Sequence, residues 1–169
     1  GNKKTKILID DLIKEYSSIL KLPKNFKEIP TGISGLIYEK IYSTNNKELK
    51  IKIENKLKHN IIEVLTARKY NLICEALSVT LDNALEATIK SKEKIIYLEF
   101  IEDEENIYFK IINTFTGNID IDKLGTKNYT SKKYGHGLGL FSILIKKDIT
   151  LATSIKDNKF INVVTVQKW

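Results

Sequence analysis

Three glycines at alternate positions, Gly135, Gly137 and Gly139, lead into an apolar run with helical spacing. A glycine-rich segment that opens a helix exposes backbone N–H groups beside the positive end of the helix dipole, and this combination suits phosphate. Positive charge lies close by on three lysines, Lys127, Lys132 and Lys133. Taken alone, the motif also fits a flexible turn without a ligand. The segment is therefore a candidate phosphate site that other parts of the chain must support or reject.

A second candidate lies in the sequence LDNALEA (81–87), where Asp82 and Asn83 interrupt an apolar helical pattern. The amide oxygen of Asn83 is a hard ligand that suits Mg²⁺, an ion that shares its coordination shell with phosphates and water. A solvent-facing turn of helix explains the same two residues without any ligand. Glu86 follows one turn later, on a face from which it could approach a phosphate, and a solvated surface acid explains it equally well.

Composition narrows the classes of function. The chain has 169 residues, of which 42% are hydrophobic and 29% charged, values typical of one globular domain. The net charge of +7 comes from lysines scattered among acids, with Arg68 as the only arginine, so a nucleic-acid-binding stripe is not indicated. No apolar run approaches the roughly 20 residues of a membrane span. Cys74 is the single cysteine, which excludes a disulfide within the chain and favours a buried structural thiol.

Periodicity predicts the elements that would position these residues. Helices are expected over 7–20, from a capping Thr31 onward, over 68–90, and from the glycine cluster to about Lys147. Alternating residues predict a strand at 48–54, a hairpin at 94–113 and a final hairpin that turns at Asp157 and Asn158. Residues 114–134 are polar and without periodicity, as expected of a lid or a disordered loop.

The order of these elements predicts the fold class. Strands adjacent in sequence pair as hairpins while helices interrupt them, so helices are expected to cover one face of a mixed β-sheet. The prediction is an α/β (α+β) protein built as a two-layer α/β sandwich. GxxxxGK[ST] is absent, and the glycines do not follow a first strand, so P-loop and Rossmann folds are excluded.

Taken together, the two candidates resemble a known superfamily. Asn83 on a helix, Asn113 after a strand, and Gly-x-Gly-Leu-Gly-Leu at a helix start resemble the GHKL, or Bergerat, ATP-binding fold of histidine kinases, gyrases, Hsp90 chaperones and MutL repair proteins. Within it, Thr-Ser-Lys at 130–132, five residues before Gly137, and the short lid resemble the Agr-type histidine kinases, the quorum-sensing receptors for peptide pheromones. The resemblance covers residues 31–169.

The resemblance implies a role for each matching position. Asn83 would hold Mg²⁺ against the triphosphate of ATP, and Lys132 would add positive charge from the lid. Asn113 would accept a hydrogen bond from the adenine amino group, where most of the superfamily carries an Asp. The remaining nucleotide-binding positions form the glycine motif: Gly135, His136, Gly137, Leu138, Gly139 and Leu140.

The chain departs from the superfamily at two places. It reads NTFTG (113–117) where Asp-x-Gly-x-Gly is expected, a departure shared with the Agr-type group. Val79 stands four residues before Asn83, where members that hydrolyse ATP carry a Glu that activates water. Slow hydrolysis is therefore expected. No residue is assigned as catalytic, and Glu86 is the only candidate.

The resemblance also implies a domain organisation and a set of partners. Residues 31–169 would form the catalytic ATP-binding domain, and residues 1–30 the tail of a dimerisation region. His59 and His136 are the only histidines, and neither lies on the predicted N-terminal helix, so the phosphoacceptor His is expected outside this chain. The implied whole is a membrane-bound homodimeric sensor that contains this domain in the cytoplasm and signals to a response regulator.

Two other functions fit the same residues. One is a GHKL serine kinase of the anti-sigma type, which phosphorylates a partner protein and needs no dimerisation helix. The other is a degenerate nucleotide-binding scaffold that keeps the fold but binds nothing well. The affinity for Mg-ATP separates the scaffold from both kinases, and a membrane sensor in the same protein would exclude the serine kinase.

Overall fold

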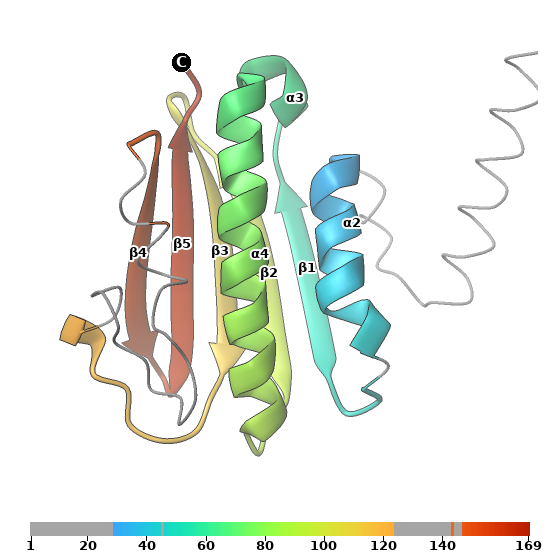
Figure 1. Cartoon of the computed structure of the whole chain (residues 1–169), viewed down its shortest axis with the longest axis vertical. Coiled ribbons are helices and arrows are strands. Elements are labelled where there is room, and N and C mark those ends of the chain that lie inside the picture. The colour runs from blue at the N-terminus through green and yellow to red at the C-terminus, as the bar shows by residue number, and fades with distance from the viewer. Residues whose placement is uncertain (1–28, 45, 124–142, 144–146) are drawn as a thin grey trace, which may run out of the picture.

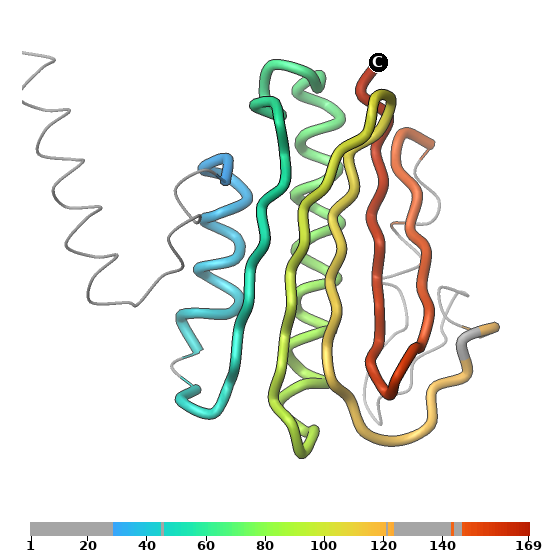
Figure 2. The backbone as a smooth tube through the Cα atoms, turned by 180° about the vertical axis from the view of Figure 1, so that it is seen from behind, coloured from blue at the N-terminus to red at the C-terminus, as the bar shows by residue number. Residues whose placement is uncertain are grey.

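The computed structural model describes residues 29–44, 46–123, 143 and 147–169. Its centre is a five-stranded sheet with the strand order β1-β2-β3-β5-β4, seen from its open face in Figure 2. The strands are β1 (Lys50–Lys56), β2 (Ile95–Glu102), β3 (Asn106–Thr114), β4 (Ile149–Lys156) and β5 (Lys159–Gln167). β1 runs parallel to β2, and every other neighbouring pair is antiparallel. The sheet is therefore mixed.

Two long helices cover one face of this sheet. α4 (Ala67–Lys90) crosses its middle, and α2 (Thr31–Lys40) packs against α4 at the β1 edge of the sheet (Figure 1). The short elements are α3 (Ile61–Val64) and the 3₁₀ turns η2 (Tyr42–Thr44) and η3 (Ile121–Lys123). This arrangement confirms the predicted two-layer α+β fold. Within the described ranges, no helix combines the length and the apolar character that crossing a membrane requires.

α4 forms because its sequence contains neither Gly nor Pro and presents one continuous apolar stripe. Thr66 caps its first turn, where the Thr66 side chain accepts a hydrogen bond of 3.2 Å from the Lys69 backbone N–H. The buried stripe consists of Ile73, Ala76, Leu77, Thr80, Leu81, Ala84 and Thr88. The helix predicted over 68–90 is thus confirmed, and its apolar stripe faces the sheet.

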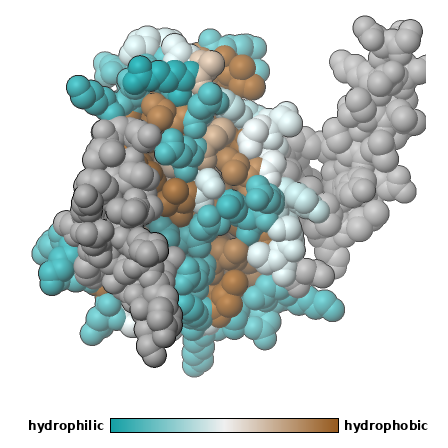
Figure 3. All heavy atoms as spheres, viewed as in Figure 1, coloured by the Kyte–Doolittle hydropathy of each residue, from teal (hydrophilic) through white to brown (hydrophobic). Residues whose placement is uncertain are grey.

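The strands bury alternate residues against that stripe. Ile96, Leu98 and Phe100 of β2 lie beside Phe109 and Ile111 of β3, and all five are nearly inaccessible to solvent. The Phe100 and Phe109 rings meet at a tilt of 60° with centroids 5.3 Å apart. On the helix side the surface shows hydrophobic patches among hydrophilic side chains (Figure 3). Leu72, Val79 and Leu85 of α4 are only partly buried.

Several predictions of local structure need correction. Thr31 does not cap α2: the helix begins at Thr31, and Pro30 occupies the cap position without a side-chain hydrogen bond. The first strand begins at Lys50 instead of residue 48, because the Asn46 side chain accepts a hydrogen bond from the Glu48 N–H and holds a turn there. The predicted helix over 7–20 lies outside the described residues. Of the helix predicted to reach about Lys147, Ile143 and Lys147 are described: Ile143 is helical and buried, whereas Lys147 lies in a bend and is not part of the helix.

The final hairpin turns at the two predicted residues. Asp157 and Asn158 both adopt positive φ, at 49° and 57°. Two successive left-handed residues match the tight turn whose twist suits a β-hairpin, and Asp and Asn tolerate this conformation better than other non-glycine residues. The turn places β4 and β5 in register, with Ser154 opposite Ile161 and Ala152 opposite Val163.

We expect substitutions at Asn158 to change stability in opposite directions. Asn158→Gly should raise the free energy of unfolding by about 0.5 kcal/mol, because glycine adopts positive φ without strain. Asn158→Val should lower it by about 1–2 kcal/mol, because a β-branched side chain is strained there. Urea titration monitored by circular dichroism measures both changes. Equal stability of the two variants would contradict the turn assignment.

Candidate functional site

Asn113 lies one residue before the end of β3, on the side of the sheet that the helices cover, and is 1% exposed. Its Nδ2 donates a hydrogen bond of 2.9 Å to the Thr114 backbone carbonyl. That bond orients the amide, so that Oδ1 is the atom left to accept. Oδ1 has no hydrogen-bond partner within the described part of the chain. The site therefore contains a buried, oriented and unpaired acceptor.

A network of buried hydroxyl groups holds this end of β3 in place. The same Thr114 carbonyl accepts a bond of 3.3 Å from the Thr88 hydroxyl near the end of α4. The Thr114 hydroxyl lies 2.8 Å from the Ser91 hydroxyl and accepts from the Ile95 N–H at 3.1 Å. These bonds join α4, β2 and β3 at one point. Since the Thr114 carbonyl also orients Asn113, the network positions the candidate acceptor.

Asn83 occupies the same end of the helix layer. Its neighbour Asp82 forms a 3.1 Å ion pair with Lys40 of α2, so that flank of α4 faces α2. Asn83 is half-buried and, one residue further along the helix, lies on the opposite flank. It precedes Thr88 by five residues, and Thr88 bonds to Thr114. The fold thus brings Asn83 and Asn113 to the same end of α4 and β3.

The structure also shows the surroundings of Glu86 and Val79, the two other residues of α4 that the sequence analysis considered. Glu86 forms an ion pair of 3.0 Å with Lys90, one turn along the helix, and its side chain is 40% exposed. That geometry is typical of a surface pair, which contributes little to stability. Val79 is half-buried and carries no group that could activate water. The described part of α4 therefore supplies the metal-ligand candidate Asn83 and no strong candidate for a general base.

The rest of the predicted site cannot be placed. Its members Lys132, Gly135, His136, Gly137, Leu138, Gly139 and Leu140 lie outside the described residues. Their assignment therefore still depends on the sequence motif and on the resemblance described above.

A further buried polar residue, for which the sequence predicts no role, lies near Asn113. Asn162 lies in the middle of β5 and is 1% exposed. Both polar atoms of its amide lack a hydrogen-bond partner among the described residues. Its register partner in β3 is Ile111, two residues before Asn113, so both asparagines face the helices on adjacent strands. The sequence does contain a signal for this residue: in FINVV (160–164), alternation places Asn162 on the same buried face as Phe160 and Val164, where an apolar residue is expected.

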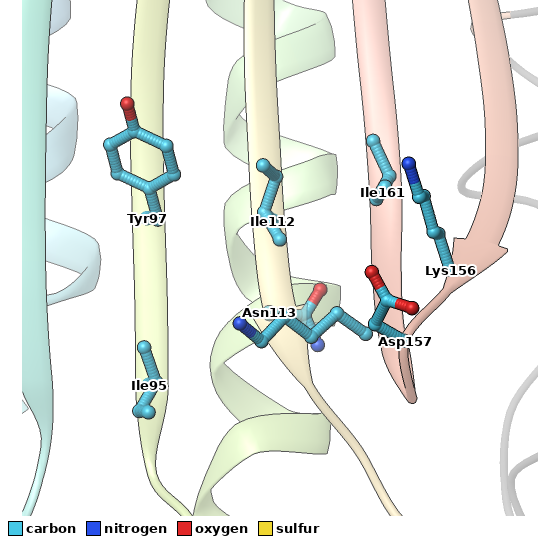
Figure 4. Close-up of a pocket in the computed structure, with 8 residues that line it drawn as sticks. Ile95, Tyr97, Ile112, Asn113, Lys156, Asp157 and Ile161 are labelled. Carbon is cyan, nitrogen blue, oxygen red and sulfur yellow. The ribbon is translucent and has the colours of Figure 1, made fainter.

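A separate hollow lies on the open face of the sheet (Figure 4). It has a volume of about 240 Å³ and is lined by Ile95, Tyr97, Ile112, Asn113, Lys156, Asp157, Lys159 and Ile161. The side chains of Tyr97, Ile112 and Ile161 point to this face, away from α4. Its floor is apolar and its charged groups lie at the hairpin turn. Asn113 belongs to both the hollow and the candidate site, but its amide is buried on the helix-covered side of β3, so the unpaired polar atoms of the candidate site do not face the hollow.

The same open face carries a charged cluster next to the hollow. Glu99 accepts hydrogen bonds from Lys56 at 2.6 Å and from Lys110 at 3.4 Å. The hydrogen bond from Lys56 lowers the pKa of Glu99, and the bond from Lys110 acts in the same direction. Partial burial of the carboxylate opposes both effects. Lys52 lies over the Tyr97 ring at 5.1 Å from its centroid. These charges are neutralised within the sheet face itself.

Comparison with known families assigns the chain to a class. A family model described as the GHKL domain matches residues 68–167, which is more than half of the chain. This stretch runs from the start of α4 to the end of β5 and includes Asn83, Asn113 and Asn162. The chain belongs to the GHKL domain family.

Solved structures of histidine kinases share the fold. The catalytic domain of the histidine kinase ThkA is 20% identical, with a TM-score of 0.60, covering 81% of this chain and 93% of that domain. The Acinetobacter baumannii histidine kinase AdeS is 16% identical, with a TM-score of 0.59, covering 96% of this chain and 78% of that one. The Erythrobacter litoralis blue-light activated histidine kinase EL346 is 12% identical, with a TM-score of 0.61, covering 85% and 43%. No curated protein matches the chain.

We expect Thr114→Val to lower the free energy of unfolding by about 1–2 kcal/mol, because it removes the hydrogen bonds that the Thr114 hydroxyl makes with the Ser91 hydroxyl and the Ile95 N–H. Thr165→Val is the matched control, since Thr165 lies half-exposed on the open face of β5, and it should change stability by less than about 0.5 kcal/mol. Thermal and urea unfolding measure both. Equal effects of the two substitutions would contradict the anchoring role of Thr114.

Proposed function

We propose that this chain binds Mg-ATP on the helix-covered side of the sheet and acts as the catalytic ATP-binding domain of a sensor histidine kinase. The observation that carries the proposal is the unpaired Oδ1 of Asn113, buried at the end of β3 in a member of the GHKL family. A buried acceptor without a partner is costly unless a ligand completes it. The amino group of adenine is a donor of the required kind.

Each candidate residue then has a task that its own chemistry supports. Asn113 accepts from the base, and the Thr88–Thr114 contact keeps it in place. Asn83 offers an amide oxygen to Mg²⁺, which neutralises charge on the phosphates. Gly135, Gly137 and Gly139 would let backbone N–H groups approach the phosphates, with Lys132 adding charge. Phosphoryl transfer depends mainly on such positioning, so no strong general base is needed in this domain.

The finer parts of the proposal concern the protein around the domain. We infer that residues 1–30 end a dimerisation region, that the phosphoacceptor His lies on that region outside this chain, and that a response regulator receives the phosphate. Thr-Ser-Lys at 130–132 and NTFTG at 113–117 support a receptor of the Agr type, anchored in the cell membrane with this domain in the cytoplasm. Such a receptor would sense a peptide pheromone.

The magnesium role of Asn83 predicts a specific loss. Asn83→Ala should remove most of the magnesium dependence of ATP binding, at little cost in stability, because the residue is half-buried at the edge of the helix stripe. Asp82→Ala is the matched control, since Asp82 pairs with Lys40 of α2 and lies on the other flank. Isothermal titration with ATP, with and without Mg²⁺, measures the effect. Magnesium dependence that survives in Asn83→Ala would remove this residue from the metal site.

Phosphotransfer tests the proposed function as a whole. Incubated with Mg-ATP alone, the chain should not label itself and should hydrolyse ATP at well below about 1 per second. When the dimerisation region of the same kinase is added as a separate protein, acid-labile phosphate should appear on its His. Transfer will be slow, because the covalent tether that raises the local concentration is missing. Acid-stable phosphate on a partner protein would favour a serine kinase, and absence of ATP binding would favour a scaffold.

A further inference from the structure

The β3–β5 half of the helix-facing side of the sheet carries two buried asparagines, Asn113 and Asn162, among apolar residues. Three buried side-chain atoms there have no hydrogen-bond partner among the described residues: Oδ1 of Asn113 and both polar atoms of the Asn162 amide. Buried amides in native proteins are normally paired, and each exception requires an explanation such as a ligand or an ordered water. Because the two unpaired amides lie on neighbouring strands, one bound molecule could explain both.

Register places the two amides within reach of one small molecule. Asn113 lies opposite Ile96 and Phe160, and Asn162 lies opposite Ile111 and Thr153, one row further along the sheet. Diagonal neighbours on adjacent antiparallel strands are about 7–8 Å apart and their side chains project from the same face. A planar monocyclic or bicyclic ring system, such as a nucleobase, spans that distance. The neighbouring side chains Phe160 and Ile111 are apolar, as a ring face requires.

Three other asparagines of the described chain show the more usual role of this side chain. Asn46 accepts from the Glu48 N–H, Asn55 from the Leu57 N–H, and Asn60 from the Ile62 N–H. Each of these amides stabilises a local turn or a helix start, which is the ordinary structural use of asparagine. Asn162 has no such use, because it lies inside β5 between Thr153 of β4 and Ile111 of β3.

We propose that Asn162 is a second base-reading residue, which together with Asn113 selects adenine over guanine. The proposal rests on the proposed function, since it places the base of the bound nucleotide at these two amides. The bond from Asn113 Nδ2 to the Thr114 carbonyl fixes the orientation of the amide, so Oδ1 is the unpaired atom that Asn113 offers to a ligand. Asn162 offers both a donor and an acceptor.

The hydrogen-bonding edge of adenine complements this arrangement. It presents an amino donor, which Oδ1 of Asn113 accepts, and a neighbouring ring nitrogen, to which Nδ2 of Asn162 donates directly or through a water. Guanine carries a carbonyl oxygen in place of that amino group, so two acceptors would face each other at Asn113. Selectivity then arises from two uncharged amides held on two strands of one rigid sheet.

The test exploits the cost of an unpaired buried amide. Asn162→Leu replaces the unpaired amide with an apolar side chain of similar size. Because the cost of burying that amide is then removed, the melting temperature of the nucleotide-free chain should rise. In the same variant the affinity for ATP should fall about five- to tenfold, and the preference for ATP over GTP should fall with it. Asn162→Ala, which leaves a cavity, should lower stability yet show the same two losses in binding. Calorimetric titration with each nucleotide and thermal unfolding give these values.

Asn55→Leu is the matched control, since Asn55 lies on the same side of the sheet in β1 and bonds to the Leu57 N–H. It should lower stability and leave both nucleotide affinities unchanged. If the unaltered chain binds ATP but both Asn162 variants bind it within twofold of that value, or lose ATP and GTP affinity equally, Asn162 does not read the base. The proposed function would survive that result. Failure of the unaltered chain to bind ATP would overturn both proposals.

Discussion

The packing of α4 against the sheet is the interaction on which the rest of the structure depends. The stripe from Ile73 to Thr88 is completed by small residues, Ala76, Thr80 and Ala84, that let the helix lie close to β3 and β5. Once that contact forms, the rotation of α4 is fixed: Asp82 turns toward Lys40 of α2, and Asn83 turns to the other flank. Its translation is fixed as well, because Thr88 bonds to the Thr114 carbonyl beside Asn113. A single buried stripe thus places the two asparagines that the sequence singles out.

The same packing buries polar atoms that the described residues leave unpaired. The interface would be more stable if its sheet side were wholly apolar, yet Asn113 and Asn162 bury amide atoms there without partners in the described chain. Proteins retain such local violations mainly where function requires them. The satisfied hydroxyl network of Thr88, Ser91 and Thr114 lies directly beside the unsatisfied amides. One group of polar residues holds the frame, and the other is left available to a bound molecule.

Sequence periodicity predicted most of this frame, because α4 and both hairpins carry strong helical or alternating patterns and the turn at Asp157 and Asn158 has the chemistry that its φ values demand. It failed where a single residue overrode a pattern: Pro30 occupies the cap position expected of Thr31, and Asn46 forms a turn that delays β1. The order of the motifs predicted Asn83 and Asn113 as candidate site residues. Asn162 was missed because its importance depends on the register of β5 against β3, and no sequence spacing between 113 and 162 reveals that register.

The central claim is that a nucleotide binds on the helix-covered side of the sheet and not in the apolar hollow of the open face. Side-chain amide resonances of asparagine in a two-dimensional ¹H–¹⁵N nuclear magnetic resonance spectrum test this most directly, since Asn113, Asn162 and Asn55 report on separate places within one layer. On addition of Mg-ATP the account predicts large shifts of the Asn113 and Asn162 resonances, with Asn55 unaffected. Shifts confined to the backbone amides around Tyr97, Ile112 and Ile161, with both asparagine side chains unmoved, would contradict it.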